Sequence, residues 1–136
     1  MNATETKPDY LLLLRGNQWH KDLAPEKVEA VMQKVQSWFD ALIQQGKVKG
    51  TRPLGDEGRT VSGKNGKMMS DGPFAESKEA IAGYIILVAD SLDEATAIAK
   101  SFPPLEYGGA IEVRPILDKC PHMEHMKELF AQMAAA

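Results

Sequence analysis

The chain has 136 residues, of which 43% are apolar and 26% are charged, and its formal net charge is -3. This composition is typical of one soluble domain; it carries no basic run of the kind that binds nucleic acid, and its single cysteine excludes an internal disulfide. No apolar run is long enough to span a membrane, and the N-terminus lacks the apolar stretch of a signal peptide, so we expect a cytoplasmic protein without a membrane partner.

The first elements predicted are a strand and a long helix. Residues 1–8 are polar and are expected to be flexible, whereas Tyr10–Leu14 is a continuous apolar run, which predicts a strand buried on both faces. Pro25 favours the first turn of a helix, and Gly46 suits its end. The apolar stripe of this helix consists of Val28, Val31, Met32, Val35, Trp38, Phe39, Leu42 and Ile43.

A weaker strand and a hairpin follow the first helix. Lys47–Leu54 reads as a strand, and Pro53 favours an edge position because proline cannot donate to a central ladder. The short segments 59–62 and 67–69 flank the dipeptide Asn65-Gly66. This dipeptide is a strong signal for a two-residue hairpin turn.

The second half of the domain repeats the order strand, helix, strand. Gly83–Ala89 is another continuous apolar run, and the helix after it begins with a capping box formed by Ser91 and Glu94. The apolar stripe of that helix is Ala95, Ile98, Ala99 and Phe102. Pro103-Pro104 stops the helix, and Ala110–Pro115 is the last predicted strand.

Residues 118–136 form an extension with the pattern of an amphipathic helix. Its apolar side chains are Met123, Met126, Leu129, Phe130 and Met133, which recur at helical spacing. We expect this helix to pack on its own domain or on a partner. Cys120, His122 and His125 lie at its start, but their spacing is not that of a zinc site, so we predict no metal and no cofactor.

The order of elements predicts an α+β fold of the ferredoxin-like βαββαβ type with an inserted β-hairpin. Its antiparallel sheet has two helices on one face. The two apolar strands carry apolar residues on both faces of the sheet. Because the helices cover only one face, the other face also needs a cover. A second copy packed face to face would supply it and would give a homodimer. The alternative cover is the C-terminal segment folded back.

Four segments together resemble the DGPF branch of the YCII-related proteins, over residues 9–117. They are YLLLLRG, LAPEKVEAVM, KMMSDGPFAESKEAIAGYIILVADSLDEATAIAKSFP and GGAIEVRPI. The resemblance implies a dimeric α/β barrel of ferredoxin-like subunits. It implies little about activity, although some relatives are encoded beside, or fused to, extracytoplasmic-function sigma factors, which suggests an accessory role in signalling.

Other relatives carry a proposed His-Asp pair, and one related enzyme is a dehydrochlorinase of chlorinated hydroxyquinones. The histidine of that pair aligns approximately with Lys27, and the aspartate aligns approximately with Phe102. The pair is therefore not carried over to this chain. His20 lies several residues upstream of Lys27. It can take the place of the histidine of the pair only if its loop folds inward.

The segment that contains Asp71 offers the first candidate site residues. An Asx-type turn explains Asp71, which precedes Gly72-Pro73; the alternative is a carboxylate that contacts a ligand or transfers a proton. Glu76 and Lys78 follow. Solvated charge is the structural explanation for both, and a position at a pocket mouth is the functional one.

The last strand and the loop after the first one offer the other candidates. Period two places Glu112 and Arg114 on the face opposite Ile111 and Val113. Either they form an ion pair, or Arg114 holds an anionic or enol-type ligand that Glu112 orients. His20 is either an exposed loop residue or a general base. Trp19 beside it either lines a pocket or closes the core.

Three functions are consistent with this sequence. The first is binding of a small anionic or phenolic molecule between the sheet and the dimer partner, at a site bounded by Asp71, Glu112 and Arg114. The second is a cofactor-free isomerase, lyase or monooxygenase that acts on a small cyclic acid, which rests on fold analogy. The third is a protein-interaction module without a ligand, which would use the methionine-rich C-terminal helix.

Overall fold

The computed structural model describes residues 8–16, 18–71 and 81–135, with backbone alone at residues 60, 64 and 67–71. The elements are β1 (Asp9–Arg15), α1 (Pro25–Gln44), β2 (Val48–Pro53), β3 (Thr60–Lys64), β4 (Lys67–Asp71), β5 (Ile81–Val88), α2 (Leu92–Lys100), the 3-10 helix η1 (Pro103–Tyr107), β6 (Ala110–Ile116) and α3 (Pro121–Ala135).

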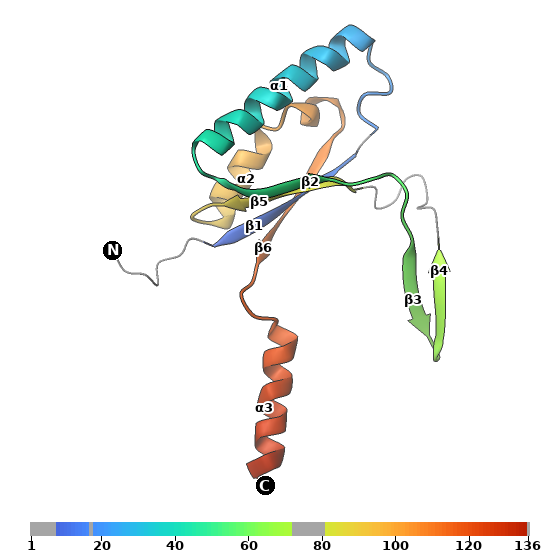
Figure 1. Cartoon of the computed structure of the whole chain (residues 1–136), viewed down its shortest axis with the longest axis vertical. Coiled ribbons are helices and arrows are strands. Elements are labelled where there is room, and N and C mark those ends of the chain that lie inside the picture. Colours follow the sequence, from blue (N-terminus) through green and yellow to red (C-terminus); the bar gives the residue numbers. More distant parts are fainter. Residues whose placement is uncertain (1–7, 17, 72–80, 136) are drawn as a thin grey trace.

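The main sheet has the strand order β2-β5-β1-β6, and all its described pairs are antiparallel. With α1 after β1 and α2 after β5, this order is ferredoxin-like, and the predicted α+β fold is confirmed. The sheet is open rather than closed into a barrel. In Figure 1, α1 and α2 lie on one side of it, and α3 projects from the other.

The core lies between the sheet and these two helices. Alternate strand residues point to it, because successive side chains of a strand face opposite sides. The buried set on the strands and α2 is Tyr10, Leu12, Ile85, Leu87, Ala89, Ala95 and Ala99. Helix α1 adds Val31, Val35 and Leu42. Phe102 completes the second cluster, beside Val31 and Val35.

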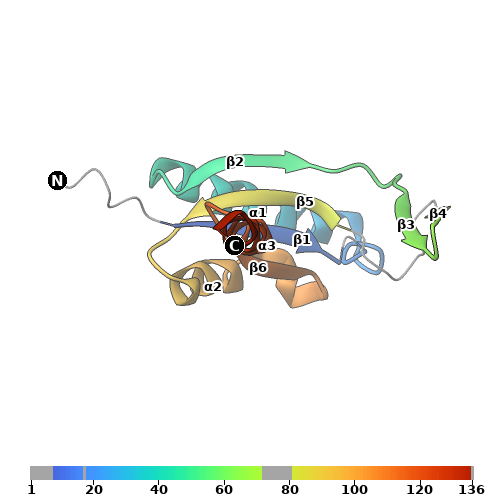
Figure 2. The same ribbon diagram turned by 90° about the horizontal axis from the view of Figure 1, so that it is seen from below.

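No helix or strand among the described residues covers the other sheet face, called here the open face. Leu11, Leu13 and Ile86 occupy the alternate positions of β1 and β5, and each is only half-buried. The prediction that both faces of these strands are buried is therefore not met within one chain. Figure 2 shows this face from below, with α3 end-on in front of it.

Helix α1 begins at Pro25 and is followed by Gly46, whose φ of 71° is the left-handed conformation that glycine adopts easily. Trp38 ties the helix to the end of α2, since its Nε1 donates a hydrogen bond of 2.8 Å to the Oγ of Ser101. Two residues of the predicted stripe, Met32 and Ile43, are exposed because they lie at its edges.

The hairpin of β3 and β4 forms a separate two-stranded sheet. Asn65 and Gly66 both have positive φ, 53° and 77°, as a type I′ turn requires. The predicted capping at Ser91 is also present, because its Oγ accepts a hydrogen bond from the amide of Glu94. Helix η1, which the sequence analysis did not predict, follows Phe102.

Candidate functional site

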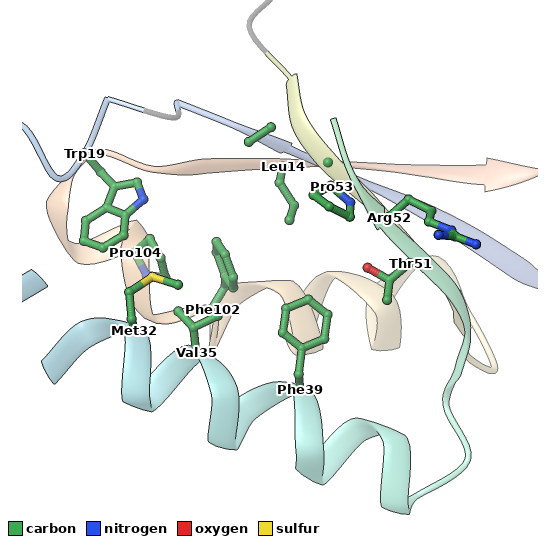
Figure 3. A pocket seen from close by; sticks show the side chains of 12 residues that line it. Leu14, Trp19, Met32, Val35, Phe39, Thr51, Arg52, Pro53, Phe102 and Pro104 are labelled. Atoms are coloured by element: carbon green, nitrogen blue, oxygen red, sulfur yellow. The ribbon is translucent and has the colours of Figure 1, made fainter. Parts of the chain in front are cut away.

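A cavity of about 310 Å³ lies between α1 and the sheet (Figure 3). Its lining comes from the strands, the loop after β1, α1 and the segment after α2. It consists of Leu14, Trp19, Met32, Val35, Phe39, Thr51, Arg52, Pro53, Ala82, Gly83, Phe102 and Pro104. Most of these side chains are aliphatic or aromatic. The volume is at the lower end of the range for small-molecule sites.

The cavity offers few polar groups. The hydroxyl of Thr51 already donates a hydrogen bond of 2.9 Å to the carbonyl of Tyr84. Arg52 contributes to the lining, but its guanidinium points away from the cavity in Figure 3. The indole nitrogen of Trp19 faces the cavity (Figure 3). The geometry therefore suits an apolar ring that carries one acceptor near Trp19.

Trp19 is held in place by an aromatic cluster. The ring of His20 contacts its edge, with centroids 5.7 Å apart, and Tyr107 lies 6.4 Å away. The Nζ of Lys27 lies 5.6 Å from the centroid of the Tyr107 ring. A hydrogen bond with the Tyr107 side chain raises the pKa of Lys27, so this group is a cation at neutral pH rather than a general base.

The structure places the candidate residues that were singled out in the sequence in different parts of the molecule. Trp19 lines the cavity, and His20 is exposed beside it. Asp71 is the last residue of β4, and its backbone pairs with Thr60 in the small sheet. Glu76 and Lys78 lie outside the described residues.

Glu112 and Arg114 lie on the open face of the sheet. Their neighbours Ile111 and Val113 pack against the core, as the period of two predicts. Glu112 accepts a hydrogen bond of 2.8 Å from Arg15 Nη1, and its second oxygen lies 3.6 Å from Arg114 Nη1. This cluster matches the ion-pair interpretation. It does not contribute to the cavity.

Sequence reasoning did not assign Val35, Phe39 or Phe102 to a site, because their helical spacing marks them as core. They pack in the core, but α1 leaves space between itself and the sheet. Pro104, in η1, was assigned only the role of stopping α2. Of the residues singled out in the sequence, only Trp19 lines this cavity.

The sequence model of the YCII-related domain matches residues 9–119. The chain belongs to the YCII-related family. A search of the curated proteins found no match. The YCII-related domain includes every element from β1 to β6 and hence the whole cavity lining, whereas α3 lies beyond it. Membership of the DGPF branch stays a prediction.

Within residues 8–16, 18–71 and 81–135, no group of three or more His, Cys, Asp or Glu side chains is placed to hold a metal ion. None of the helices in that part of the chain is both long and apolar enough to cross a membrane.

Proposed function

We propose that this YCII-related protein binds a small aromatic molecule with one hydrogen-bond acceptor, such as a phenol, in the cavity between α1 and the sheet. The observation that carries the proposal is the apolar cavity of about 310 Å³ with the indole N–H of Trp19 directed into it. Ligand sites of this kind combine an apolar lining with a few polar groups that orient the ligand. A phenolic oxygen that accepts from Trp19 would satisfy the indole donor.

Binding is a better proposal than catalysis for this cavity. Among the described residues that line it, the only titratable side chain is Arg52, which points away. An acid-base catalyst has to lie within hydrogen-bond reach of its substrate. A binder would also fit the accessory role in sigma-factor signalling that the resemblance suggests, with the bound molecule as its input.

We further propose that the protein is a homodimer whose interface includes the open sheet face, in the manner of a dimeric α/β barrel. The apolar residues of that face are Leu11, Leu13, Tyr84, Ile86, Val88 and Ile116. An apolar face that the described residues leave uncovered favours association. The Arg15–Glu112–Arg114 cluster would then lie at the interface, where the predicted site between sheet and partner would form.

Titration with two related probes tests the cavity. Calorimetry with 1-naphthol and with naphthalene compares ligands that differ by one hydroxyl group. We expect 1-naphthol to bind more tightly to the wild type, because Trp19 hydrogen-bonds its oxygen. Replacing Trp19→Phe should remove most of this preference, since phenylalanine keeps an aromatic ring without the donor.

A matched pair of variants on α1 locates the binding. Met32 lines the cavity and is 49% exposed, whereas Ile43 on the same helix is 55% exposed and is not part of the lining. Met32→Trp should weaken 1-naphthol binding about tenfold by filling the cavity, and Ile43→Trp should leave it unchanged. Equal affinities in both variants, or no binding of either probe to the wild type, would refute the proposal.

A further inference from the structure

We propose that α3 docks on a second copy of this chain rather than on its own domain. The inference rests on the proposed dimer and adds α3 to its interface. The helix carries a stripe formed by Met123, Met126, Phe130 and Met133, called here the α3 seam. The spacing of three, four and three residues is the pattern of a helix that packs along a single line of contact.

The part of the chain that the structure describes does not cover the α3 seam. No residue of α3 is buried, and Phe130 and Met133 are 59% and 71% exposed. A helix of 15 residues is marginally stable in water unless an apolar face is packed. The ion pair between Lys127 and Glu124 lies within the helix itself. A packing partner is therefore required to stabilise α3.

The position of α3 identifies that partner. In Figures 1 and 2, α3 stands on the open side of the sheet and extends away from it. Two sheets that pack face to face lie about 10 Å apart, whereas the 15 residues of α3 span about 22 Å. A second copy that covers the open face must therefore contact α3.

Continuity of the apolar surface points the same way. Ile116 at the end of β6 and Leu117 in the connector are both exposed, and they lead from the open face to the α3 seam. The open face and the α3 seam are thus two uncovered apolar surfaces joined by the short connector 117–120. One second copy buries both in the same interface.

Sedimentation equilibrium of the full chain tests this inference with matched variants. Phe130→Glu places a charge in the α3 seam, and we expect it to weaken dimerisation at least about tenfold, as removal of a buried anchor does. Gln132→Glu places the same charge two residues away, off the seam, and should change the dissociation constant less than about twofold. Equal dissociation constants for the two variants would overturn the docking of α3.

A third variant separates this inference from the proposed dimer. Ile86→Glu places a charge on the open face and should also abolish the dimer. If it does so while Phe130→Glu has no effect, the dimer stands and the docking of α3 is wrong. A wild-type chain that is monomeric at about 100 μM overturns both. The cavity is tested independently by its own titration.

Photo-crosslinking decides between the partner and the helix's own domain. A benzophenone residue is placed at position 130, and for comparison at position 132, in the full chain. Irradiation should crosslink two chains when the benzophenone is at position 130. The yield of crosslinked dimer should be far lower when it is at position 132. A crosslink from position 130 that is found only within one chain would show α3 folded back on its own domain, contrary to the inference.

Discussion

The two faces of the central sheet are built from the same strands but end in different environments. On the helix-covered face, Leu12, Ile85 and Leu87 are completely buried. On the open face, their neighbours Leu11, Leu13 and Ile86 are equally apolar and only half-buried. The register alternates between the two sets along β1 and β5.

This difference teaches that hydrophobicity alone does not place a residue in the core. Both faces carry the composition of a buried surface, but α1 and α2 cover only one of them. The covered face stabilises the single chain, whereas the open face stabilises an assembly to the extent that one forms. The two faces should therefore respond differently to mutation and to protein concentration.

The largest effect is expected for Leu12→Ala compared with Leu13→Ala. Leu12 is completely buried, so its truncation leaves a cavity and should lower the free energy of unfolding by about 3 kcal/mol. Leu13 is half-buried on the open face, and the same change should lower it by about 1 kcal/mol in dilute solution.

Urea unfolding at several protein concentrations measures both variants. If a second copy covers the open face, the effect of Leu13→Ala should grow as the protein concentration rises, and that of Leu12→Ala should stay constant. Equal effects of the two variants at the lowest concentration would contradict the distinction between the faces.

Gly83→Ala should have the next largest effect. A Cβ at Gly83 would lie 2.8 Å from the carbonyl oxygen of Arg52 and 3.2 Å from the Cα of Pro53. Because both are backbone atoms of β2, this strand has to move away from β5, at a cost of about 2 kcal/mol. Thermal unfolding measures the loss, and a variant as stable as the wild type would show that the β2 edge yields without strain.

A smaller effect is expected for Glu112→Gln on the open face. The change removes the carboxylate that contacts Arg15 and Arg114. All three side chains are at least a third exposed in the single chain, so the loss of stability should be below about 1 kcal/mol in dilute solution.

The same variant sharpens the comparison at higher concentration. In an interface Arg114 would be buried without the carboxylate of Glu112, and such a group is destabilising by several kcal/mol. The variant should therefore reduce the free energy of dimerisation by more than it reduces the free energy of unfolding. Analytical ultracentrifugation beside urea unfolding compares the two quantities, and an unchanged dissociation constant would place the cluster outside the interface.

The smallest effect is expected for Lys27→Gln, on the helix-covered side. Its hydrogen bond with Tyr107 raises the pKa of Lys27 in the folded state. The stabilisation is therefore complete below the ordinary lysine pKa and is lost as the pH rises through the folded value. The variant should lower Tm slightly and equally from about pH 6 to pH 9, and the difference should begin to shrink only above about pH 10.5. A difference that instead changes near pH 7 would contradict this assignment.

Much of the fold was predictable because its signals are local. The turn at Asn65-Gly66, the cap at Ser91 and the stop at Pro103 each follow from the conformational preferences of a few residues. The period of two on β6 likewise placed Glu112 and Arg114 on the open face. The Arg15–Glu112 pair was not predicted, since it joins residues 97 positions apart in the chain.

The candidate site was much less predictable. The cavity depends on how far α1 stands from the sheet, and that distance is fixed by many weak contacts rather than by a motif. Val35 and Phe39 look the same in the sequence whether a helix packs tightly or leaves a space. Of the residues predicted for a site, only Trp19 lines this cavity. Glu112 and Arg114 lie on the open face, Asp71 ends β4 in the small sheet, and Glu76 and Lys78 lie outside the described residues.

The sequence by itself determined the order of strands and helices, the ferredoxin-like class and the apolar character of both sheet faces. Periodicity, capping residues and turn residues act within a few positions, so they can be read without coordinates. Only the tertiary structure decided which face α1 and α2 cover, where the cavity lies and that α3 stands clear of its domain. These features depend on packing between distant segments, where no local pattern specifies the distance or the angle.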